Sequence, residues 1–491
     1  MSAAFVFYNL LPSTAISFLT HMLIVIVLAM LIIQPPVVMR VNELLTSAPE
    51  GVEQLDDLVE ELAQEFNLSA TARIEESTSV PAPGGEPIID QIIDTAGGFD
   101  GPIEPSLPAE VGIELAIDIG LEGPPVKHLT RGMARQGDNL MSSRSPGTGG
   151  MHQGSGVTSE SEKAVAMALK WLVEHQNSDG SWNFDHARGL CNRRCADGGK
   201  LTDCTTGATG LALLPLLGAG QTHKEGKYKE AVGKGLYYLA SRMKVNNNVG
   251  DLSEGTLYAH GISSIVLCEA YAMTRDRGLL APAQLSLNYI AYAQDPIGGG
   301  WRYVPRQPGD TSAVGWQLMA LKSGHMAYLN VSTNTVKGAS RFLDAVQGDG
   351  GATYGYSGPG NGPATSAVGL LSRMYLGWKK EEPALQRGVE NLAKRGPAAG
   401  QFYFNYYATQ IMRHNDGEPW KKWHDAMWDS LISSQEKQDH AAGSWFQRGD
   451  HGADAGGRLY CTSLATMILE VPYRHLPLYK SEAAEGDFPV D

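Results

Sequence analysis

Basic residues are few in this chain of 491 residues, and they form no extended positive face. Lysine and arginine total 39 against 53 aspartate and glutamate, which gives a formal net charge of −14 at pH 7. The segment 50–122 holds eighteen acids and one base, so the rest of the chain is close to neutral. Binding to nucleic acid requires clustered positive charge that neutralises phosphates. The composition therefore excludes a nucleic-acid-binding protein.

Several catalytic signatures are also missing. The chain contains no Walker A loop, no H-E-x-x-H and no G-x-S-x-G sequence, which argues against the enzyme classes that those motifs define. The stretches "GGGW" and "GPGNGP" follow no strand pattern, so we do not expect them to cradle a phosphate. Long β-branched runs are scarce while 43% of the residues are hydrophobic. An all-α fold with a sizeable core is expected.

Cysteine is rare, with five residues in the whole chain. Cys191 and Cys195 in "CNRRC" are close enough in sequence to form a local disulfide, which would suit an oxidising compartment outside the cytoplasm. The same two thiols together with Cys204 are potential metal ligands, although the C-x3-C spacing is loose for a zinc site. Free thiols are the third alternative, and the sequence does not choose among them.

Charge is entirely lacking from Ala15 to Ile33, which reads "AISFLTHMLIVIVLAMLII". Nineteen helical residues extend about 28 Å, close to the hydrocarbon thickness of a bilayer. Pro35 and Pro36 then end the helix. We therefore expect an N-terminal tail at 1–14, a single transmembrane helix at 15–37 in contact with the lipid bilayer, and a globular domain on the periplasmic side.

Proline, glycine and serine are dense between the apolar run and the first long helical pattern. This composition and its acidity are typical of an extended linker, expected at 38–160, with one short amphipathic helix near 52–66. A short acidic tail is expected at 481–491.

The region 161–480 alternates apolar segments of helical length with glycine-rich loops. It groups into six pairs. The first helices of the pairs are expected near Glu162–His175, Tyr228–Met243, Ala283–Ala293, Thr335–Val346, Pro383–Lys394 and Trp420–Gln435. The second helices are expected to begin near Cys204, Tyr258, Asp310, Pro363, Phe402 and Leu459. The second helices are apolar on nearly all faces and must be buried on nearly all faces. Six such pairs fit a closed double ring, an α6/α6 toroid with the second helices inside.

One phrase recurs at the ends of the first helices. It reads "QNSDGSW" at Gln176, Gly180 and Trp182, and "QDPIGGGW" with Gln294, Gly298 and Trp301. A longer version, "QEKQDHAAGSW", holds Gln435, Gly443 and Trp445. Glycine permits the turn, the aromatic ring packs over the helix end, and glutamine is expected to bond to free backbone groups. We interpret the phrase as a structural connection between repeats.

The phrase "QNSDGSW" resembles the Q-x-x-x-G-x-W repeat of squalene–hopene cyclases, oxidosqualene cyclases and related terpenoid cyclases. The helical-pair period also resembles that of the protein prenyltransferase β subunits. Residues 160–480 are similar to bacterial prenyltransferase/squalene oxidase repeat proteins, in stretches such as "GATGLALLPLLGAGQTH" and "FYFNYYATQIMRHNDGEPW". The resemblance implies an α/α toroid with an axial cavity and a link to hydrophobic or isoprenoid ligands.

The cyclases protonate their substrates with an acid motif of the D-x-D-D-T type. The similar stretch here, "QPGDTSAVGW", keeps Asp310 and Thr311 but has Gln307 and Gly309 where the other acids belong. Asp310 is therefore either a catalytic acid or the N-cap of an inner helix. The N-cap reading predicts a lowered pKa, because the helix dipole favours a carboxylate. The side chains expected to line the cavity are His260, Thr311, Trp316, Tyr403, Tyr406 and Tyr407.

The resemblance to prenyltransferases implies a possible zinc site, because that family binds zinc through Asp, Cys and His side chains. Asp203, Cys204, His260 and Cys461 stand near the starts of second helices and are chemically competent ligands. Our leading expectation is a membrane-anchored toroid that binds or scaffolds a hydrophobic ligand or protein partner. The alternative is an enzyme, either of isoprenoid type with altered acids or metal-dependent, with its site at the toroid mouth.

Overall fold

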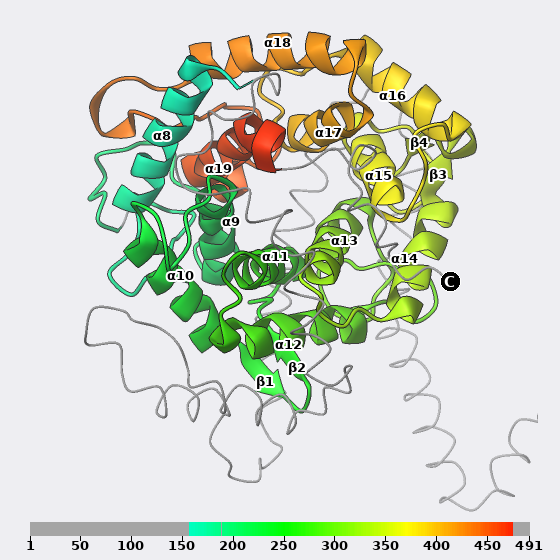
Figure 1. Ribbon diagram of the computed structural model, residues 1–491, viewed down its shortest axis with the longest axis horizontal. Coiled ribbons are helices and arrows are strands. Elements are labelled where there is room, and N and C mark those ends of the chain that lie inside the picture. Colours follow the sequence, from blue (N-terminus) through cyan, green and yellow to red (C-terminus); the bar gives the residue numbers. More distant parts are fainter. Residues whose placement is uncertain (1–156, 188, 475–491) are drawn as a thin grey trace, which may run out of the picture. The chain divides into compact units, whose positions relative to one another are not determined.

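The structure is a computed structural model that describes residues 157–187 and 189–474 (Figure 1). The predicted transmembrane helix, the linker up to residue 156 with its short helix, and both tails lie outside the described residues. The linker was predicted to extend to residue 160, but the first described helix already begins at Ser159. Among the residues that are described, no helix is both long and apolar enough to cross a membrane.

Twelve α-helices alternate between two concentric layers in the described part of the chain. The outer helices are α8 (Ser159–Glu174), α10 (Lys229–Arg242), α12 (Arg277–Ala293), α14 (Thr333–Val346), α16 (Pro383–Arg395) and α18 (Glu418–Ser434). The inner helices are α9 (Thr205–Gly218), α11 (Leu257–Thr274), α13 (Thr311–Met326), α15 (Pro363–Tyr375), α17 (Phe402–Asn415) and α19 (Ala453–Arg474). These positions match the expected pairs, except that α12 begins at Arg277 and α19 at Ala453, earlier than expected, and the all-α toroid is confirmed.

The inner helices form a closed ring. Each packs against the next in chain order from α9 to α19, and α19 packs against α9. Their sequences explain this position: in α9, every residue from Thr206 to Gly218 is buried. In the outer helix α16 a single stripe is buried, formed by Ala384, Leu385, Gly388, Val389 and Leu392. Apolar residues on all faces thus select the inner layer, and an amphipathic pattern selects the outer one.

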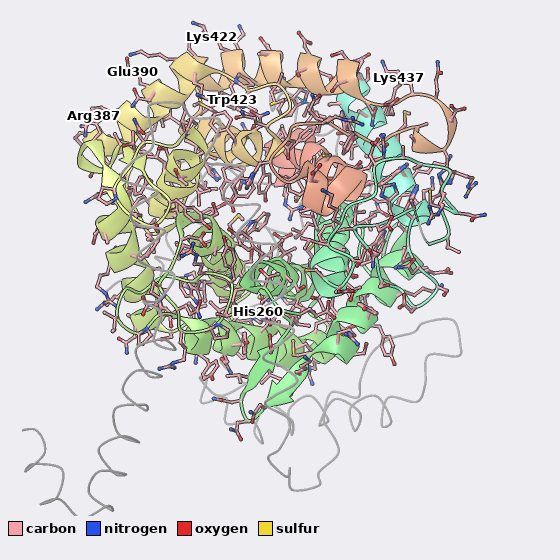
Figure 2. All side chains as sticks on the ribbon, turned by 180° about the vertical axis from the view of Figure 1, so that it is seen from behind. His260, Arg387, Glu390, Lys422, Trp423 and Lys437 are labelled. Atoms are coloured by element: carbon pink, nitrogen blue, oxygen red, sulfur yellow. The ribbon has the colours of Figure 1, made fainter. Side chains whose placement is uncertain are left out.

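Charged side chains cover the outer helices. Figure 2 shows Arg387 and Glu390 of α16 and Lys422 of α18 on the outer surface, whereas Trp423 of α18 points inward. The Trp423 indole N–H donates a hydrogen bond to Thr409 Oγ1 of the inner helix α17, at 2.9 Å. Each outer helix therefore contacts the inner ring through one face.

Two short antiparallel hairpins join the layers. Strands β1 (Lys244–Asn246) and β2 (Val249–Asp251) connect α10 to α11, and β3 (Gln347–Gly348) pairs with β4 (Thr353–Tyr354) between α14 and α15. The structure also contains two 3-10 turns, η1 (Asp349–Gly351) and η2 (Asp439–Ala441).

The recurring phrase ties three elements together at each full occurrence. The Trp182 indole N–H donates to the carbonyl of Leu172 in the last turn of α8, at 2.7 Å. The Gln176 side-chain amide donates to the carbonyls of Gly180 and of Ala231 in α10, at 2.9 Å each. The phrase thus gives a second hydrogen bond to a carbonyl at the helix end, which also accepts the His175 N–H, and it binds the next outer helix.

The second occurrence has the same geometry with one difference from our expectation. Gln294 donates to Gly299 and to Thr335 of α14, and Trp301 donates to Ile290 of α12. The glycine that makes the turn is Gly299, with φ of +82°, rather than Gly298. A Cβ at Gly299 would lie 2.1 Å from the Gly338 carbonyl oxygen. The chain therefore needs glycine here both for the turn and for the close approach of α14.

The third occurrence closes the ring. The Gln435 amide donates to Gly443 at 2.9 Å and to Ala164 of α8 at 2.8 Å. The Trp445 indole N–H donates to Leu431 in α18 at 2.8 Å. The last outer helix is thereby connected to the first, across 271 residues of sequence.

We predict that Gln435→Ala lowers the free energy of unfolding by about 2–3 kcal/mol, because two buried carbonyls lose their donor. The exposed Gln438 provides the control, and Gln438→Ala should change stability by less than about 0.5 kcal/mol. Urea denaturation of the full chain measures both. Equal effects of the two substitutions would show that Gln435 does not hold the ring closed.

Candidate functional site

Asp310 occupies the start of the inner helix α13. Its Oδ1 accepts a hydrogen bond from the backbone N–H of Ala313 at 2.7 Å, which is N-cap geometry. The side chain is fully buried. Within the described residues, the second oxygen Oδ2 makes no hydrogen bond of standard geometry, and Arg302 Nε lies 3.9 Å from it.

Tyrosines surround this carboxyl group. The Tyr258 hydroxyl of α11 lies 3.4 Å from Asp310 Oδ1. The hydroxyls of Tyr303 and Tyr356 are hydrogen-bonded to each other at 2.8 Å. The Arg302 guanidinium lies over both of those rings, 5.3 and 5.6 Å from their centroids. We call Tyr258, Arg302, Tyr303, Asp310 and Tyr356 the tyrosine–aspartate cluster.

The pKa of Asp310 moves in the direction opposite to our expectation. Burial raises it to about 6, and the hydrogen bond from Ala313 and the charge of Arg302 offset this only in part. The sequence argument considered the helix dipole alone, whereas the loss of hydration in a fully buried site is the larger effect. A carboxyl group with this pKa exchanges a proton near neutral pH.

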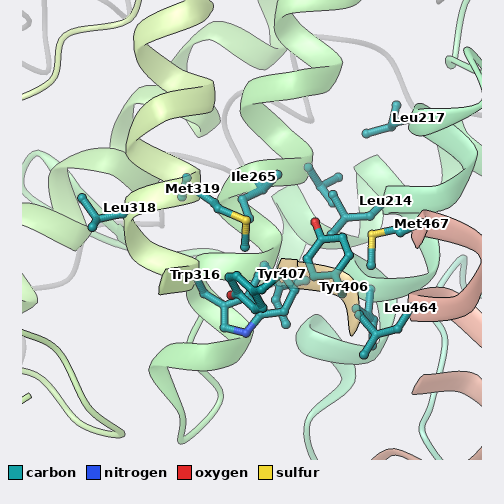
Figure 3. Packing of buried hydrophobic residues seen from close by; sticks show 14 of the residues in the cluster. Leu214, Leu217, Ile265, Trp316, Leu318, Met319, Tyr406, Tyr407, Leu464 and Met467 are labelled. Carbon is teal, nitrogen blue, oxygen red and sulfur yellow. The ribbon is translucent and has the colours of Figure 1, made fainter. Parts of the chain in front are cut away.

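An aromatic layer lies deeper in the inner ring (Figure 3). Trp316 of α13 stacks on Tyr406 of α17, with centroids 5.9 Å apart, and meets Tyr407 edge to face. Tyr403 lies 5.0 Å from Tyr407 and, through a hydroxyl 3.5 Å from the Ser312 carbonyl, reaches toward α13. Met319 of α13, Ile265 of α11, and Leu464 and Met467 of α19 accompany these rings in Figure 3.

The Tyr407 hydroxyl is buried, and the Tyr403 side chain is its polar neighbour. Gly315 lets the Tyr407 hydroxyl approach α13, since a Cβ there would lie 3.1 Å from this hydroxyl and 2.4 Å from Val368. The structure thus brings together Trp316, Tyr403, Tyr406 and Tyr407 as a group. We call these four residues the aromatic layer.

Two predicted cavity residues lie elsewhere. His260 of α11 accepts the backbone N–H of Leu252 at Nδ1, at 3.1 Å, and its Nε2 faces the carbonyl of Ser286 in the outer helix α12, at 3.0 Å (Figure 2). The Thr311 hydroxyl donates to the carbonyls of Gly355 and Tyr356. Both side chains therefore bind backbone rather than face the axis. Because nearly every position of an inner helix is buried, its sequence pattern does not indicate which side chains face the axis of the ring.

The structure does not assemble the predicted ligand set Asp203, Cys204, His260 and Cys461. Both nitrogens of His260 are engaged with backbone groups, and burial lowers its pKa to about 4. Burial also raises the pKa of the Cys204 and Cys461 thiols to about 12 each. In the described ranges, one group of at least three metal-ligating side chains converges, and it contains none of the four.

That group contains the two cysteines of "CNRRC". Cys191 and Cys195 are free thiols in the structure, which is the third of the alternatives that the sequence left open. The backbone N–H of Cys195 donates to Cys191 Sγ at 3.2 Å. Their neighbours are His175 and His440, which are distant in sequence and were not predicted as partners.

Sequence reasoning also missed the buried ion pair at the other end of the inner ring. Arg474 of α19 contacts Glu269 of α11 at 3.1 Å and Glu470 at 3.7 Å. Single charged residues in apolar helices gave no indication that they would meet. A groove of about 910 Å³ on the outer surface, between Glu160 and the α18 residues His424 and Trp428, contains none of the predicted site residues.

Comparisons with known proteins give the following. No protein-family model matches the chain, and no curated protein matches it. Among solved structures, an inactive α-1,6-mannanase variant from Salegentibacter sp. with α-1,6-mannotriose shares 9% identity at a TM-score of 0.43, covering 62% of this chain and 98% of that one.

Two further structures are similar to the same extent. The type II terpene cyclase MstE from Scytonema shares 14% identity at a TM-score of 0.43, covering 64% of this chain and 97% of that one. An α-amylase from Clostridium perfringens shares 12% identity at 0.43, covering 63% and 97%. Since these TM-scores are below 0.5, we define the class of this protein, an α/α toroid, from its own closed ring of helix contacts.

Asp310→Asn tests the raised pKa through the dependence of stability on pH. A folded-state pKa near 6 gives roughly 3 kcal/mol of stability that is present below about pH 4 and lost as the pH rises through 6. Asparagine keeps an acceptor for the Ala313 N–H but does not ionise. The variant should therefore lose less stability than the wild type between about pH 4.5 and about pH 7.5 in urea denaturation.

Asp276, the N-cap of α12, is the matched control. Burial alone would raise its pKa, but hydrogen bonds from His223 and Gly278 and the charge of Lys224 lower it. Its carboxylate therefore stabilises the fold above its unfolded-state pKa, and this is lost as the pH falls. Asp276→Asn should cost stability at neutral pH. The same pH response in both variants would contradict the environment described for Asp310.

Proposed function

We propose that this protein is a binding module whose toroid holds a ligand with an apolar body and a cationic or hydrogen-bond-donating end. The observation that carries the proposal is the aromatic layer together with the buried carboxyl group of Asp310, which stands at the start of the same helix α13 that holds Trp316. The nearest base, Arg302, lies 3.9 Å from Asp310 Oδ2. A cationic or hydrogen-bond-donating group of a ligand would therefore meet an acidic acceptor beside an aromatic surface.

The chemistry of the lining supports this class of ligand. Stacked tryptophan and tyrosine rings present apolar faces with negative electrostatic potential, which favour hydrophobic and cationic groups. Methionine and leucine side chains from the inner helices extend the apolar surface (Figure 3). The resemblance of the repeat phrase to terpenoid cyclases agrees with an isoprenoid-like body.

An enzyme of isoprenoid type is the second candidate, and the pKa of Asp310 favours it. A carboxyl group with a pKa of about 6 can donate a proton at moderate pH. It stands at the start of an inner helix beside the hydroxyl of Tyr258. In this case Asp310 is the general acid, and Asp310→Asn would abolish turnover while leaving ligand binding.

We further propose that residues 15–37 anchor the toroid to a membrane and that the toroid faces the periplasm. The uncharged run from Ala15 to Ile33 supports the anchor. Fractionation of cells that express the full chain, or a chain without residues 1–37, tests it: the first should sediment with membranes and the second should not. Protection of the toroid from protease added to spheroplasts, in which the periplasmic side is exposed, would place it in the cytoplasm.

Binding is tested with two probes that share an apolar body, the neutral alcohol farnesol and the cationic farnesylamine. Titration of the full chain in detergent, followed by tryptophan fluorescence, should give tighter binding of farnesylamine. Asp310→Asn should remove that preference, since an ionised carboxylate is worth at least about tenfold to a buried cation. Trp316→Leu should weaken both probes, because it removes stacking area.

Substitutions far from the cluster serve as controls. Asp429→Asn changes an exposed acid of α18, and Tyr292→Leu changes an aromatic side chain that is 50% exposed. Neither should alter the affinity for the two probes. If no probe binds, or if the controls weaken binding as much as Trp316→Leu does, the proposed binding site is wrong.

A further inference from the structure

Four potential metal ligands converge where the toroid closes. They are His175, Cys191, Cys195 and His440, and one ligand atom from each lies within 4.8 Å of the others. His175 is the C-cap residue of α8, the first outer helix, and His440 lies in η2, the turn that follows the last outer helix α18. Figure 1 shows the loop after α18 beside α8. The cluster therefore joins the two ends of the ring.

Three of the separations between ligand atoms are close to those of a tetrahedral site. Cys195 Sγ lies 3.5 Å from His175 Nε2 and 3.1 Å from His440 Nδ1, and Cys191 Sγ lies 3.7 Å from His440 Nδ1. Zinc bonds of about 2.3 Å to sulfur and about 2.0–2.1 Å to nitrogen place tetrahedral ligands roughly 3.3–3.8 Å apart. The side chains thus need little rearrangement to hold one ion.

The histidine nearest to the core is already oriented for ligation. His175 Nδ1 lies 2.6 Å from the carbonyl oxygen of Trp171, so Nδ1 carries the proton and Nε2 presents its lone pair to the thiols. A ligating histidine commonly donates its other N–H to a backbone carbonyl, which fixes the tautomer and the ring orientation. Burial keeps this ring neutral by lowering its pKa to about 3.

The burial of the ligands and the charge balance of the site both favour a divalent metal ion. Three of the four ligands are buried and His440 is partly exposed, which leaves one side open for entry of a metal. A divalent ion that displaces the two thiol protons to solvent gives two thiolates and one dication, so the buried site has no net charge. Two sulfur and two nitrogen ligands in a tetrahedron are typical of zinc.

We propose that His175, Cys191, Cys195 and His440 form a structural Zn²⁺ site that fastens the first repeat of the toroid to the last. All four positions are protein ligands, as in structural rather than catalytic zinc sites. The site is separate from the tyrosine–aspartate cluster and does not depend on the proposed ligand. Its function is to hold α8 and the loop after α18 together at the closure that Gln435 also bridges.

Metal analysis of the full chain, purified in mild detergent under reducing conditions from zinc-supplemented cells, tests the proposal. The expected result is about one Zn²⁺ per chain, and Co²⁺ in its place should give the visible absorption of a tetrahedral thiolate site. Cys191→Ala/Cys195→Ala should lose the metal. Cys268→Ala/Cys461→Ala, which removes two other buried cysteines, should keep it.

His440→Ala provides a variant that should fold, because His440 is only partly buried in a surface turn. The substitution should weaken Zn²⁺ affinity by at least about tenfold, because even the loss of a residue that only hydrogen-bonds to a metal ligand has an effect of this size. His451→Ala, an exposed histidine outside the cluster, should not. A strong zinc chelator should lower the melting temperature of the wild type and leave that of the cysteine double variant unchanged.

Three outcomes would overturn the site: no stoichiometric metal in the reduced wild type, metal retained in the cysteine double variant, or a Cys191–Cys195 disulfide found by peptide mapping of the native chain. None of them bears on the binding of farnesylamine, so the zinc site and the proposed ligand site can fail independently.

Discussion

Ring closure is the constraint on which the rest of this structure depends. Six helical pairs bury their apolar faces only if the last pair finds the first, since an open end would expose the inner helix α9 or α19. Two contacts act at this junction. Gln435 donates to α8, and the Gly443 backbone passes so near to Met167 that a Cβ would lie 2.3 Å from its carbonyl oxygen. The local phrase of each repeat thus becomes a long-range connection at the last one.

Closure also determines where polar groups can exist in the inner ring. The inner helices bury nearly all of their residues, so the buried charges that they carry need partners close by. Arg474 and Glu269 do so between α19 and α11. Asp310 instead caps its own helix and has Arg302 3.9 Å from its second oxygen, and its complete burial raises its pKa. The same burial that stabilises the ring therefore makes Asp310 chemically distinctive.

The tyrosine–aspartate cluster and the His175–Cys191–Cys195–His440 group have different positions in this architecture. The first lies at the starts of inner helices, where groups from neighbouring repeats meet. The second lies in loops between outer and inner helices, where repeats one and six meet. The two groups share no residue.

The sequence by itself determined the layer of each helix and most helix positions. The all-apolar pattern of α9 and the single stripe of α16 are local properties, and the phrase at Gln176 marked the joints between pairs. The exception among the outer helices was α12, which begins at Arg277 rather than near Ala283 because Pro282 is accommodated inside it. Only the tertiary structure decided which side chains meet. His175 and Cys195 joined His440 across the closure, and His260 turned toward α12 instead of the axis. The periodicity of apolar residues predicts how much of a helix is buried, but it does not predict which other helices cover it. The pKa of Asp310 likewise depends on burial by residues that are far away in the chain.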